Sequence, residues 1–401
     1  MSYSELYNAV WKMFSANENR FGNLEFHKLD YVSTNQYEQN ELEGDTDENY
    51  NVLLQYFLKH NEYSQKYIFR YLNAPDNSFD ENNNFNYYII KQAGNEKIKS
   101  AILLLHGLNE RNWAKYLPWA IRLAEITGKA IILFPLAFHM DRAPSEWSDP
   151  RIMKQVAKER MKLFPDARYS TFANAALSTR LQFAPERLLL SGVQTYDDIV
   201  NLMKEIKTGG HKYFEKDANI DLFGYSIGAF LGEILLTSNP DNLFDSSRMC
   251  MFCGGAVLDT AIPVSKAIMD SEAARAMQRY YRREEFISGK ANDITRMVKS
   301  FEAVGIYFKS LINSTIYPAL TKSFLNSVKD KIKVIGLGQD TVFSVDSLKN
   351  TFGNGLSGVL DILDYNYKYT HEKPFSENHP EPDKVDYAFE KTFAIAGGFL
   401  S

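Results

Sequence analysis

Residues 219–233 read NIDLFGYSIGAFLGE, a short apolar run, a serine between two glycines, and a second apolar run. The first run predicts a buried strand over 220–223, and the second predicts a helix over 226–236. Between them, Gly224-Tyr225-Ser226-Ile227-Gly228 matches the pattern G-x-S-x-G. A sharp turn from strand into helix forces the central serine into strained backbone angles and exposes its Oγ. The sequence therefore predicts a strand–turn–helix unit with Ser226 at its apex.

The residue types around Ser226 suit chemistry at this turn. Positions two before and two after the serine come close to neighbouring backbone, where Gly224 and Gly228 fit because they lack a Cβ. The predicted helix directs its N-terminal amides and its dipole at a site where negative charge develops. The alternative is a glycine-rich turn in which a serine occurs by chance. The flanking apolar runs favour a nucleophilic serine over that alternative.

Outward from this unit, apolar runs alternate with helical patterns along the chain. Continuous apolar runs are typical of strands buried on both faces of a sheet. The predicted strands include 85–91, 101–105, 129–134, 249–253 and 332–337, and the predicted helices include 112–127, 195–206 and 383–396. Strands that alternate with helices predict an α/β fold with a mostly parallel central sheet and helices on both faces.

Two segments interrupt this alternation. Residues 137–190 contain a helix-like piece and a long irregular stretch, and residues 256–325 read as several helices. An amphipathic pattern in the second segment is formed by Ile294, Met297, Val298 and Phe301. Such helices either pack on the core or form a lid over a site, and either segment could supply the lid.

The expected organisation is one catalytic core with two additions. Residues 1–98 are expected to form an N-terminal region with leading strands. The core is expected to comprise 99–255 and 326–401, interrupted by a helical lid or cap insertion at 256–325.

The strand, the G-x-S-x-G turn and the helix together resemble the nucleophile elbow of the α/β-hydrolase superfamily, in its serine esterase and lipase-like form. The chain looks like an uncharacterised bacterial-type branch of that superfamily. The resemblance covers about 99–255 and 326–401 and implies the α/β-hydrolase fold. It also implies a catalytic triad in the chain order serine, acid, histidine, each partner just past a late strand.

Two acids and two histidines after Ser226 are candidates for the triad. Asp340 follows the predicted strand 332–337, where the superfamily usually places its acid, whereas Asp346 suits the N-cap of a helix at 345–351. His371 follows a strand-like, tyrosine-rich stretch, and His379 lies in a loop before the last helix. We predict that Asp340 and His371 are the partners of Ser226, with His379 as the alternative base.

The stretch LLLHGLNERNW at 103–113 places a His-Gly step after a buried strand. His106-Gly107 resembles the step after an early strand of many α/β-hydrolases, where backbone amides form the oxyanion hole. The resemblance implies that the N–H groups of Leu108 and Ile227 hold the oxyanion. The alternative is a strand-end turn that merely requires a glycine.

The net charge, the cysteines and a glycine-rich motif limit which binding partners and cofactors we expect. The formal charge of −5 argues against nucleic acid as a partner, because phosphate binding needs a basic surface. Cys250 and Cys253 fall in one predicted core strand, and Gly353-Asn354-Gly355-Leu356-Ser357-Gly358 does not open a helix after a strand, so neither suggests a metal or dinucleotide site. We expect no cofactor. Neither a signal peptide nor a membrane span is apparent, so we expect a cytoplasmic protein.

These observations predict a serine hydrolase that acts on a small-molecule carboxylic ester through an acyl-enzyme intermediate. A serine peptidase or amidase on the same fold is the main alternative. A non-catalytic binding protein with this fold is the other. The acyl length and the oligomeric state have no signature in the sequence.

Overall fold

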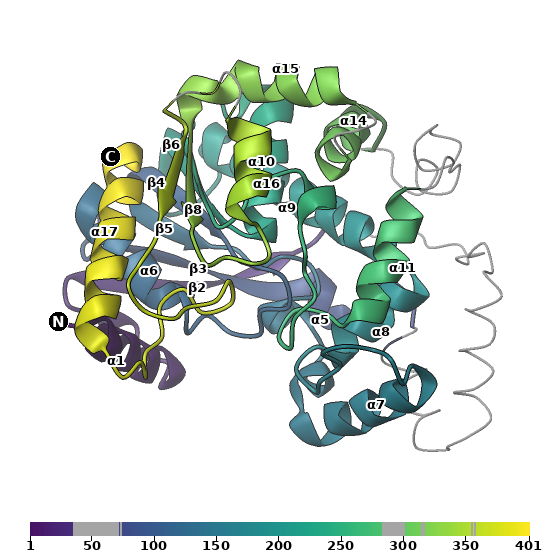
Figure 1. The fold of residues 1–401 in the computed structure, drawn as a ribbon. Helices are drawn as coiled ribbons and strands as arrows, with labels where there is room; N and C mark the ends of the chain where they lie inside the picture. Colours follow the sequence, from purple (N-terminus) through teal and green to yellow (C-terminus); the bar gives the residue numbers. More distant parts are fainter. Residues whose placement is uncertain (35–71, 73, 283–300, 314–316, 354–355, 357) are drawn as a thin grey trace.

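Nine strands form one central sheet (Figure 1) in the computed structural model, which describes residues 1–34, 72, 74–282, 301–313, 317–353, 356 and 358–401. The strands are β1 (Arg20–Phe21), β2 (Leu24–Val32), β3 (Asn84–Gln92), β4 (Ile98–Leu105), β5 (Ala130–Leu133), β6 (Phe214–Tyr225), β7 (Met249–Phe252), β8 (Ile332–Leu337) and β9 (Leu360–Leu363). Ile294, Met297 and Val298 of the predicted amphipathic pattern lie outside the described residues, as do Asn354, Gly355 and Ser357 of the glycine motif.

The order of the strands across the sheet is β1-β2-β3-β5-β4-β6-β7-β8-β9. The first four in this order pair antiparallel, and every pair from β5 to β9 is parallel. The predicted mostly parallel sheet is therefore confirmed. With its sharp turn at the end of the central strand β6, the chain has the α/β-hydrolase fold.

Helices cover both faces of the sheet. The longer helices are α1 (Tyr3–Ser15), α6 (Tyr116–Thr127), α7 (Pro150–Leu163), α8 (Ala175–Phe183), α9 (Arg187–Thr208), α10 (Ile227–Ser238), α11 (Ser271–Tyr281), α14 (Phe301–Ile312), α15 (Pro318–Val328), α16 (Val345–Phe352) and α17 (Pro382–Leu400). α1, α6 and α17 pack together on one face, and α9, α10 and α14 lie on the other (Figure 1). Among the described residues, no helix is long and apolar enough to cross a membrane.

Strand β4 shows how the sequence divides between the two faces. Alternate residues of a strand point to opposite sides of the sheet. Ala101, Leu103 and Leu105 accordingly belong to the core on the α9–α10 side, and Ile102 and Leu104 belong to the core on the α6–α17 side. All five are fully buried, which explains the continuous apolar run in the sequence.

The segment 137–190 is more helical than the sequence predicted. It contains α7 and α8, and α9 already begins at Arg187 rather than at Thr195. The buried faces of these helices hold charged side chains: Arg160 Nη2 lies 2.6 Å from Asp270 Oδ2, and both residues are buried. Buried cations interrupt the apolar periodicity by which helices are predicted. This is why the segment looked irregular.

The tyrosine-rich stretch before His371 is a loop for most of its length. β9 ends at Leu363, and Tyr365, Tyr367 and Tyr369 follow it without strand pairing. Their rings pack on one another and on the core, with Tyr365 and Tyr367 stacked at 6.2 Å between centroids. Alternating buried rings mimic the period of a strand, so the predicted strand was too long.

Glu233 lies in α10 with its carboxyl group buried. Its Oε1 has no hydrogen-bond partner among the described residues. Burial raises its pKa well above the ordinary value of 4.5. The folded protein therefore holds a proton at Glu233 that the unfolded chain loses above about pH 4.5. Stability should fall as the pH rises above that value, by up to about 1.4 kcal/mol per pH unit until the folded-state pKa is reached.

Glu233→Gln should remove this pH-dependent penalty, because an amide does not titrate. We expect the variant to exceed the native protein in free energy of unfolding at pH 8, with a difference that shrinks towards pH 5. Urea titrations at several pH values measure this. Glu96→Gln, in an exposed loop, is the matched control. A difference that is the same at every pH would contradict the assignment.

Candidate active site

Ser226 lies at the apex of the turn between β6, which ends at Tyr225, and α10, which begins at Ile227. Its φ of 57° and ψ of −120° are angles that residues other than glycine rarely adopt. Such a conformation costs about 1–3 kcal/mol and persists where the surrounding structure enforces it. The first amides of α10 follow the serine directly, so the positive end of the helix dipole lies at its hydroxyl group.

Gly224 and Gly228 bring the turn close to its neighbours. A Cβ on Gly224 would lie 2.5 Å from Cα of Ala229, and a Cβ on Gly228 would lie 2.3 Å from the carbonyl oxygen of Leu105. Both contacts are with backbone atoms, which cannot rotate away as a side chain can. Close approach therefore explains both glycines of the motif.

Gly228→Ala should lower the free energy of unfolding by about 2–4 kcal/mol, because the methyl group would force α10 away from β4. The matched control is Gly398→Ala in α17, where a Cβ meets no atom within 4 Å. That change should raise stability by about 0.5–1 kcal/mol, since alanine has less backbone entropy to lose. Urea unfolding of both variants provides the comparison, and equal effects would contradict the close approach.

Three buried side chains form a hydrogen-bonded row at this turn. His371 Nε2 lies 2.9 Å from Ser226 Oγ, and His371 Nδ1 lies 2.8 Å from Asp340 Oδ2. The exposed fractions of Ser226, Asp340 and His371 are 4%, 4% and 3%. The other carboxylate oxygen, Asp340 Oδ1, accepts from the N–H groups of Val342 and Phe343 at 2.8 and 3.0 Å. A carboxylate cannot donate, so Nδ1 carries the hydrogen and Nε2 is free to accept from the serine.

The competing candidates lie elsewhere. His379 Nδ1 accepts from the N–H of Glu381 at 3.1 Å, and its ring packs on Tyr367. Asp346 is the second residue of α16, and it is not the N-cap that the sequence suggested. The cap is Ser344, whose side chain accepts from the N–H of Ser347 at 3.2 Å.

Sequence reasoning missed two neighbours of His371 and Asp340. The ring of Tyr225 stacks on His371 at 5.3 Å between centroids, and its hydroxyl donates to the His371 carbonyl oxygen. Cys253, one residue beyond β7, is buried beside Asp340; burial and that carboxylate raise the pKa of its thiol. Tyr225 occupies the variable position before the serine, so the motif carries no signal for it. Cys253 was predicted inside the strand and thus away from the site.

The two amides predicted to hold an oxyanion are both available. The N–H of Gly107 donates to Tyr116 Oη at 2.8 Å, and that hydroxyl donates to Glu110 Oε1 at 2.9 Å. The backbone N–H groups of Leu108 and Ile227 have no acceptor among the described residues. A negatively charged oxygen near Ser226 would supply one.

His106 holds the loop that carries Leu108. Its Nδ1 lies 2.8 Å from the carbonyl oxygen of Gly107, and its Nε2 accepts from the N–H of Leu136 at 3.0 Å. Both ring nitrogens are thus occupied, and burial lowers the pKa of His106 well below its usual value. The residue positions the loop and does not exchange protons.

A profile of a protein family matches residues 1–401 of the chain, and its description is "Family of unknown function (DUF6051)". The chain belongs to DUF6051. No curated protein matches its sequence.

Several solved structures resemble this DUF6051 chain in the course of the backbone, at low sequence identity. A mutant of the esterase rPPE is 10% identical, with a TM-score of 0.44, over 100% of this chain and 91% of that one. A hyperthermophilic esterase from the archaeon Pyrobaculum calidifontis is 11% identical, with a TM-score of 0.44, over 98% of this chain and 89% of that one. An acylaminoacyl peptidase from Pyrococcus horikoshii is 14% identical, with a TM-score of 0.40, over 79% of this chain and 39% of that one.

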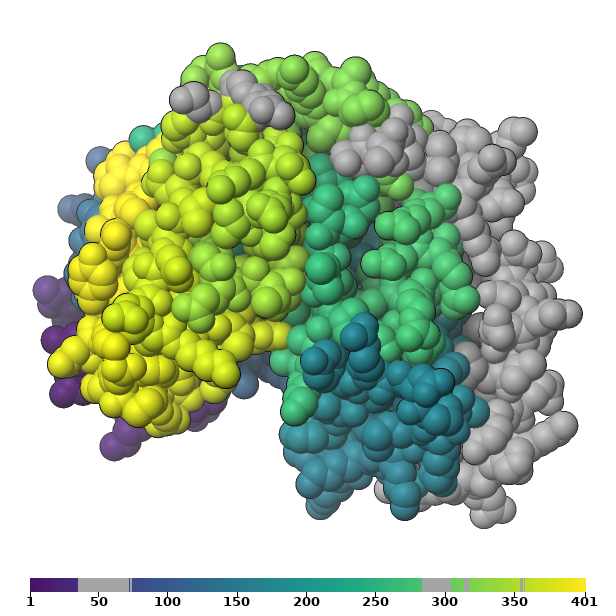
Figure 2. Space-filling view, viewed as in Figure 1, coloured from purple at the N-terminus to yellow at the C-terminus, as the bar shows by residue number. Residues whose placement is uncertain are grey.

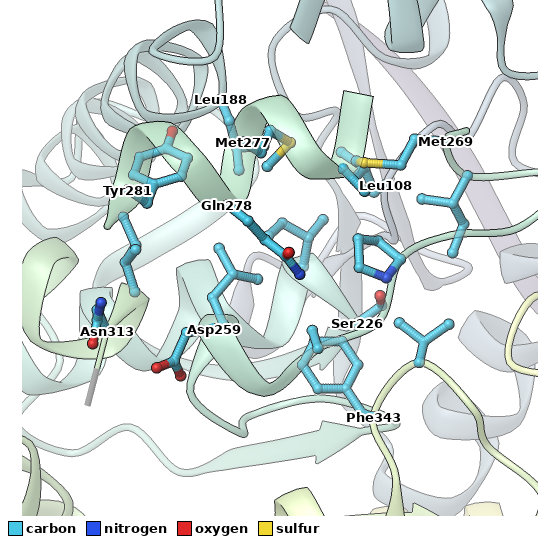
Figure 3. A pocket seen from close by; sticks show the side chains of 18 of the residues that line it. Leu108, Leu188, Ser226, Asp259, Met269, Met277, Gln278, Tyr281, Asn313 and Phe343 are labelled. Atoms are coloured by element: carbon cyan, nitrogen blue, oxygen red, sulfur yellow. The ribbon is translucent and has the colours of Figure 1, made fainter. Parts of the chain in front are cut away.

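A mainly apolar pocket lies beside Ser226 in the DUF6051 structure, and its empty space, including the part that is open to solvent, is about 820 Å³ (Figure 3). Ser226 is at one end, and Asp259 and Asn313 are at the other (Figure 3). The surface is hollowed between the C-terminal residues and the segment that contains α7 (Figure 2). Within the described ranges, no group of three His, Cys, Asp or Glu side chains is arranged to hold a metal ion.

Both segments that were candidates for a lid contribute to the wall of this cavity. Met277 and Tyr281 of α11 and Ile312 of α14 come from 256–325, and Leu188 comes from 137–190. Whether either segment opens and closes over Ser226 stays a prediction.

Proposed function

We propose that this DUF6051 protein is a serine hydrolase that cleaves carboxylic esters. The observation that carries the proposal is the unbroken hydrogen-bonded row from Ser226 through His371 to Asp340, at 2.9 and 2.8 Å. The strained serine at a helix N-terminus and the two available amides nearby support the same chemistry.

In the proposed reaction, Ser226 Oγ attacks the carbonyl carbon of the ester while His371 Nε2 takes the hydroxyl proton. Asp340 stabilises the imidazolium that forms, and the N–H groups of Leu108 and Ile227 hold the oxyanion. Collapse of the tetrahedral intermediate expels the alcohol, which receives the proton from His371. Water then attacks the acyl-enzyme while His371 Nε2 takes its proton, and collapse of this second tetrahedral intermediate releases the acid as His371 returns the proton to Ser226 Oγ.

An assay with p-nitrophenyl esters of increasing acyl length tests the function and the substrate size together. The apolar cavity supports a preference for apolar acyl groups over acetate. We expect kcat/KM to rise by about tenfold for each 1.4 kcal/mol of transition-state stabilisation that a longer acyl group gains from the cavity wall, until the acyl group fills the cavity. Matched p-nitroanilides separate an esterase from an amidase or peptidase. Absence of turnover with every ester and anilide would favour a non-catalytic binding protein.

A further inference from the structure

The ammonium group of Lys115 lies between the loop that carries the proposed oxyanion amide and the loop that carries the proposed base. Lys115 directly precedes α6, and its side chain is only 16% exposed. Its Nζ pairs with Glu110 Oε1 and donates to the carbonyl oxygen of Glu372 at 3.3 Å. Glu110 follows β4 in the same loop as Leu108, and Glu372 is the residue after His371. One largely buried cation therefore connects two loops that are distant in sequence.

On the side of the oxyanion loop, a chain of hydrogen bonds runs from Lys115 to the amide next to Leu108. Glu110 Oε1 accepts from Lys115 Nζ and also from Tyr116 Oη, the latter at 2.9 Å. A tyrosine hydroxyl has one hydrogen, so Tyr116 Oη is left to accept from the N–H of Gly107, at 2.8 Å. The place of Gly107, and with it the place of the Leu108 amide, therefore depends on the pair of charges at Lys115 and Glu110.

On the side of the base, Lys115 acts on the backbone at 371–372 in two ways. It donates directly to the Glu372 carbonyl oxygen, and its Nζ also lies 4.5 Å from the centre of the Tyr225 ring. A cation is attracted to the face of an aromatic ring. The Tyr225 ring stacks on His371 with 19° between the planes, and its hydroxyl donates to the His371 carbonyl oxygen. Lys115 therefore holds both His371 and the residue after it.

The loss of this ammonium group would affect the two loops together. The side chain of Glu110 is only 21% exposed, and it would lose the cation with which its carboxylate is paired. A largely buried carboxylate without a partner is costly, so Glu110 would turn towards water and release the hydroxyl of Tyr116. Lys115 does not line the pocket at Ser226, so it does not meet the substrate there. Its effect on the reaction must pass through the positions of the loops.

We infer that Lys115 is a positioning residue that holds the loop of Leu108 and the loop of His371 in register with each other. The oxyanion amide and the base then keep their places around Ser226 together. This inference rests on the proposed function for the roles of Leu108 and His371. It adds a residue outside the G-x-S-x-G turn on which both roles depend.

Lys115→Met tests this role, because it removes the charge and the donors and keeps an unbranched side chain. We expect kcat for a p-nitrophenyl ester to fall by about 10- to 100-fold, as a small misplacement of catalytic groups allows. KM should stay near the native value, because the pocket that binds the ester is intact. Steady-state rates measure both constants.

Lys333→Met is the matched control. The side chain of Lys333 is also 16% exposed, pairs with Asp361 Oδ2 at 2.9 Å and donates to the carbonyl oxygen of Gly358 at 3.1 Å. It lies near the start of β8, whereas Asp340 follows the end of that strand. The change breaks a comparable pair and should keep the native kcat. Urea unfolding of both variants shows whether the two losses of stability are alike.

Hydrogen–deuterium exchange followed by mass spectrometry reports on the two loops without catalysis. Lys115→Met should speed amide exchange in peptides that cover 106–111 and 370–375, and Lys333→Met should change neither. Glu110→Gln breaks the same pair of charges at equal volume and repeats the test if Lys115→Met does not fold.

Faster exchange in both loops of Lys115→Met, with no hydrolysis of any ester or anilide by the native protein, would overturn the proposed function and support the positioning role. Native kcat in the folded variant, a loss of kcat no larger than that of Lys333→Met, or exchange that changes in one loop or in neither would overturn the positioning role.

Discussion

Replacing Ser226 with alanine should lower kcat for ester hydrolysis by about 10⁴- to 10⁶-fold. Without Oγ no acyl-enzyme can form, and only the available amides and the binding cavity remain to accelerate attack by water. Alanine carries the same Cβ as serine, so the strained turn is retained. Steady-state rates with a p-nitrophenyl ester measure the effect.

Ser145→Ala is the matched control for this change, because it removes an exposed hydroxyl outside the row. It should leave kcat at the native value. Circular dichroism of both variants shows whether the fold is kept. A Ser226→Ala protein that is folded and retains native kcat would contradict the role of this serine.

His371→Ala should lower kcat by about 10⁴-fold or more, because no other side chain in the described part of the chain forms a hydrogen bond with Ser226 Oγ and could take its proton. The nitrogen that would act as base lies 2.9 Å from Oγ, and its ring is oriented by Asp340 at 2.8 Å. The fall should appear in kcat with little change in KM, because the apolar cavity that binds the ester is intact.

His379→Ala tests the alternative base in the same assay. Its Nδ1 is occupied by the N–H of Glu381, so its loss should leave kcat near the native value. The reverse pattern, with activity lost in His379→Ala and kept in His371→Ala, would transfer the role of base to His379.

The fold could be predicted because its core strands are buried on both faces. Short runs such as 101–105 are apolar at every position and so lack the periodic polar residues of an amphipathic helix. The G-x-S-x-G turn lies where one such strand meets a helix. The expected chain order of serine, acid and histidine limited the candidate triad partners of Ser226 to acids and histidines that follow late strands. The structure brings Ser226, Asp340 and His371 within hydrogen-bond distance, as that order suggested, and their catalytic roles stay a prediction.

What could not be predicted depends on contacts between distant parts of the chain. Only part of the helical structure within 137–190 was predicted, because buried Arg160 is paired with Asp270, which is distant in sequence. The loop at Tyr365 was mistaken for strand because its rings alternate in burial.

Labelling with a fluorophosphonate, followed by mass spectrometry of the intact protein and its peptides, tests the nucleophile most directly. Only an activated serine beside a base reacts quickly with this reagent. The geometry predicts one adduct per folded chain, on Ser226, and none after Ser226→Ala, after His371→Ala at the same reaction time, or in urea-unfolded protein. A folded native protein that carries no adduct on Ser226 would contradict the assignment of a serine hydrolase.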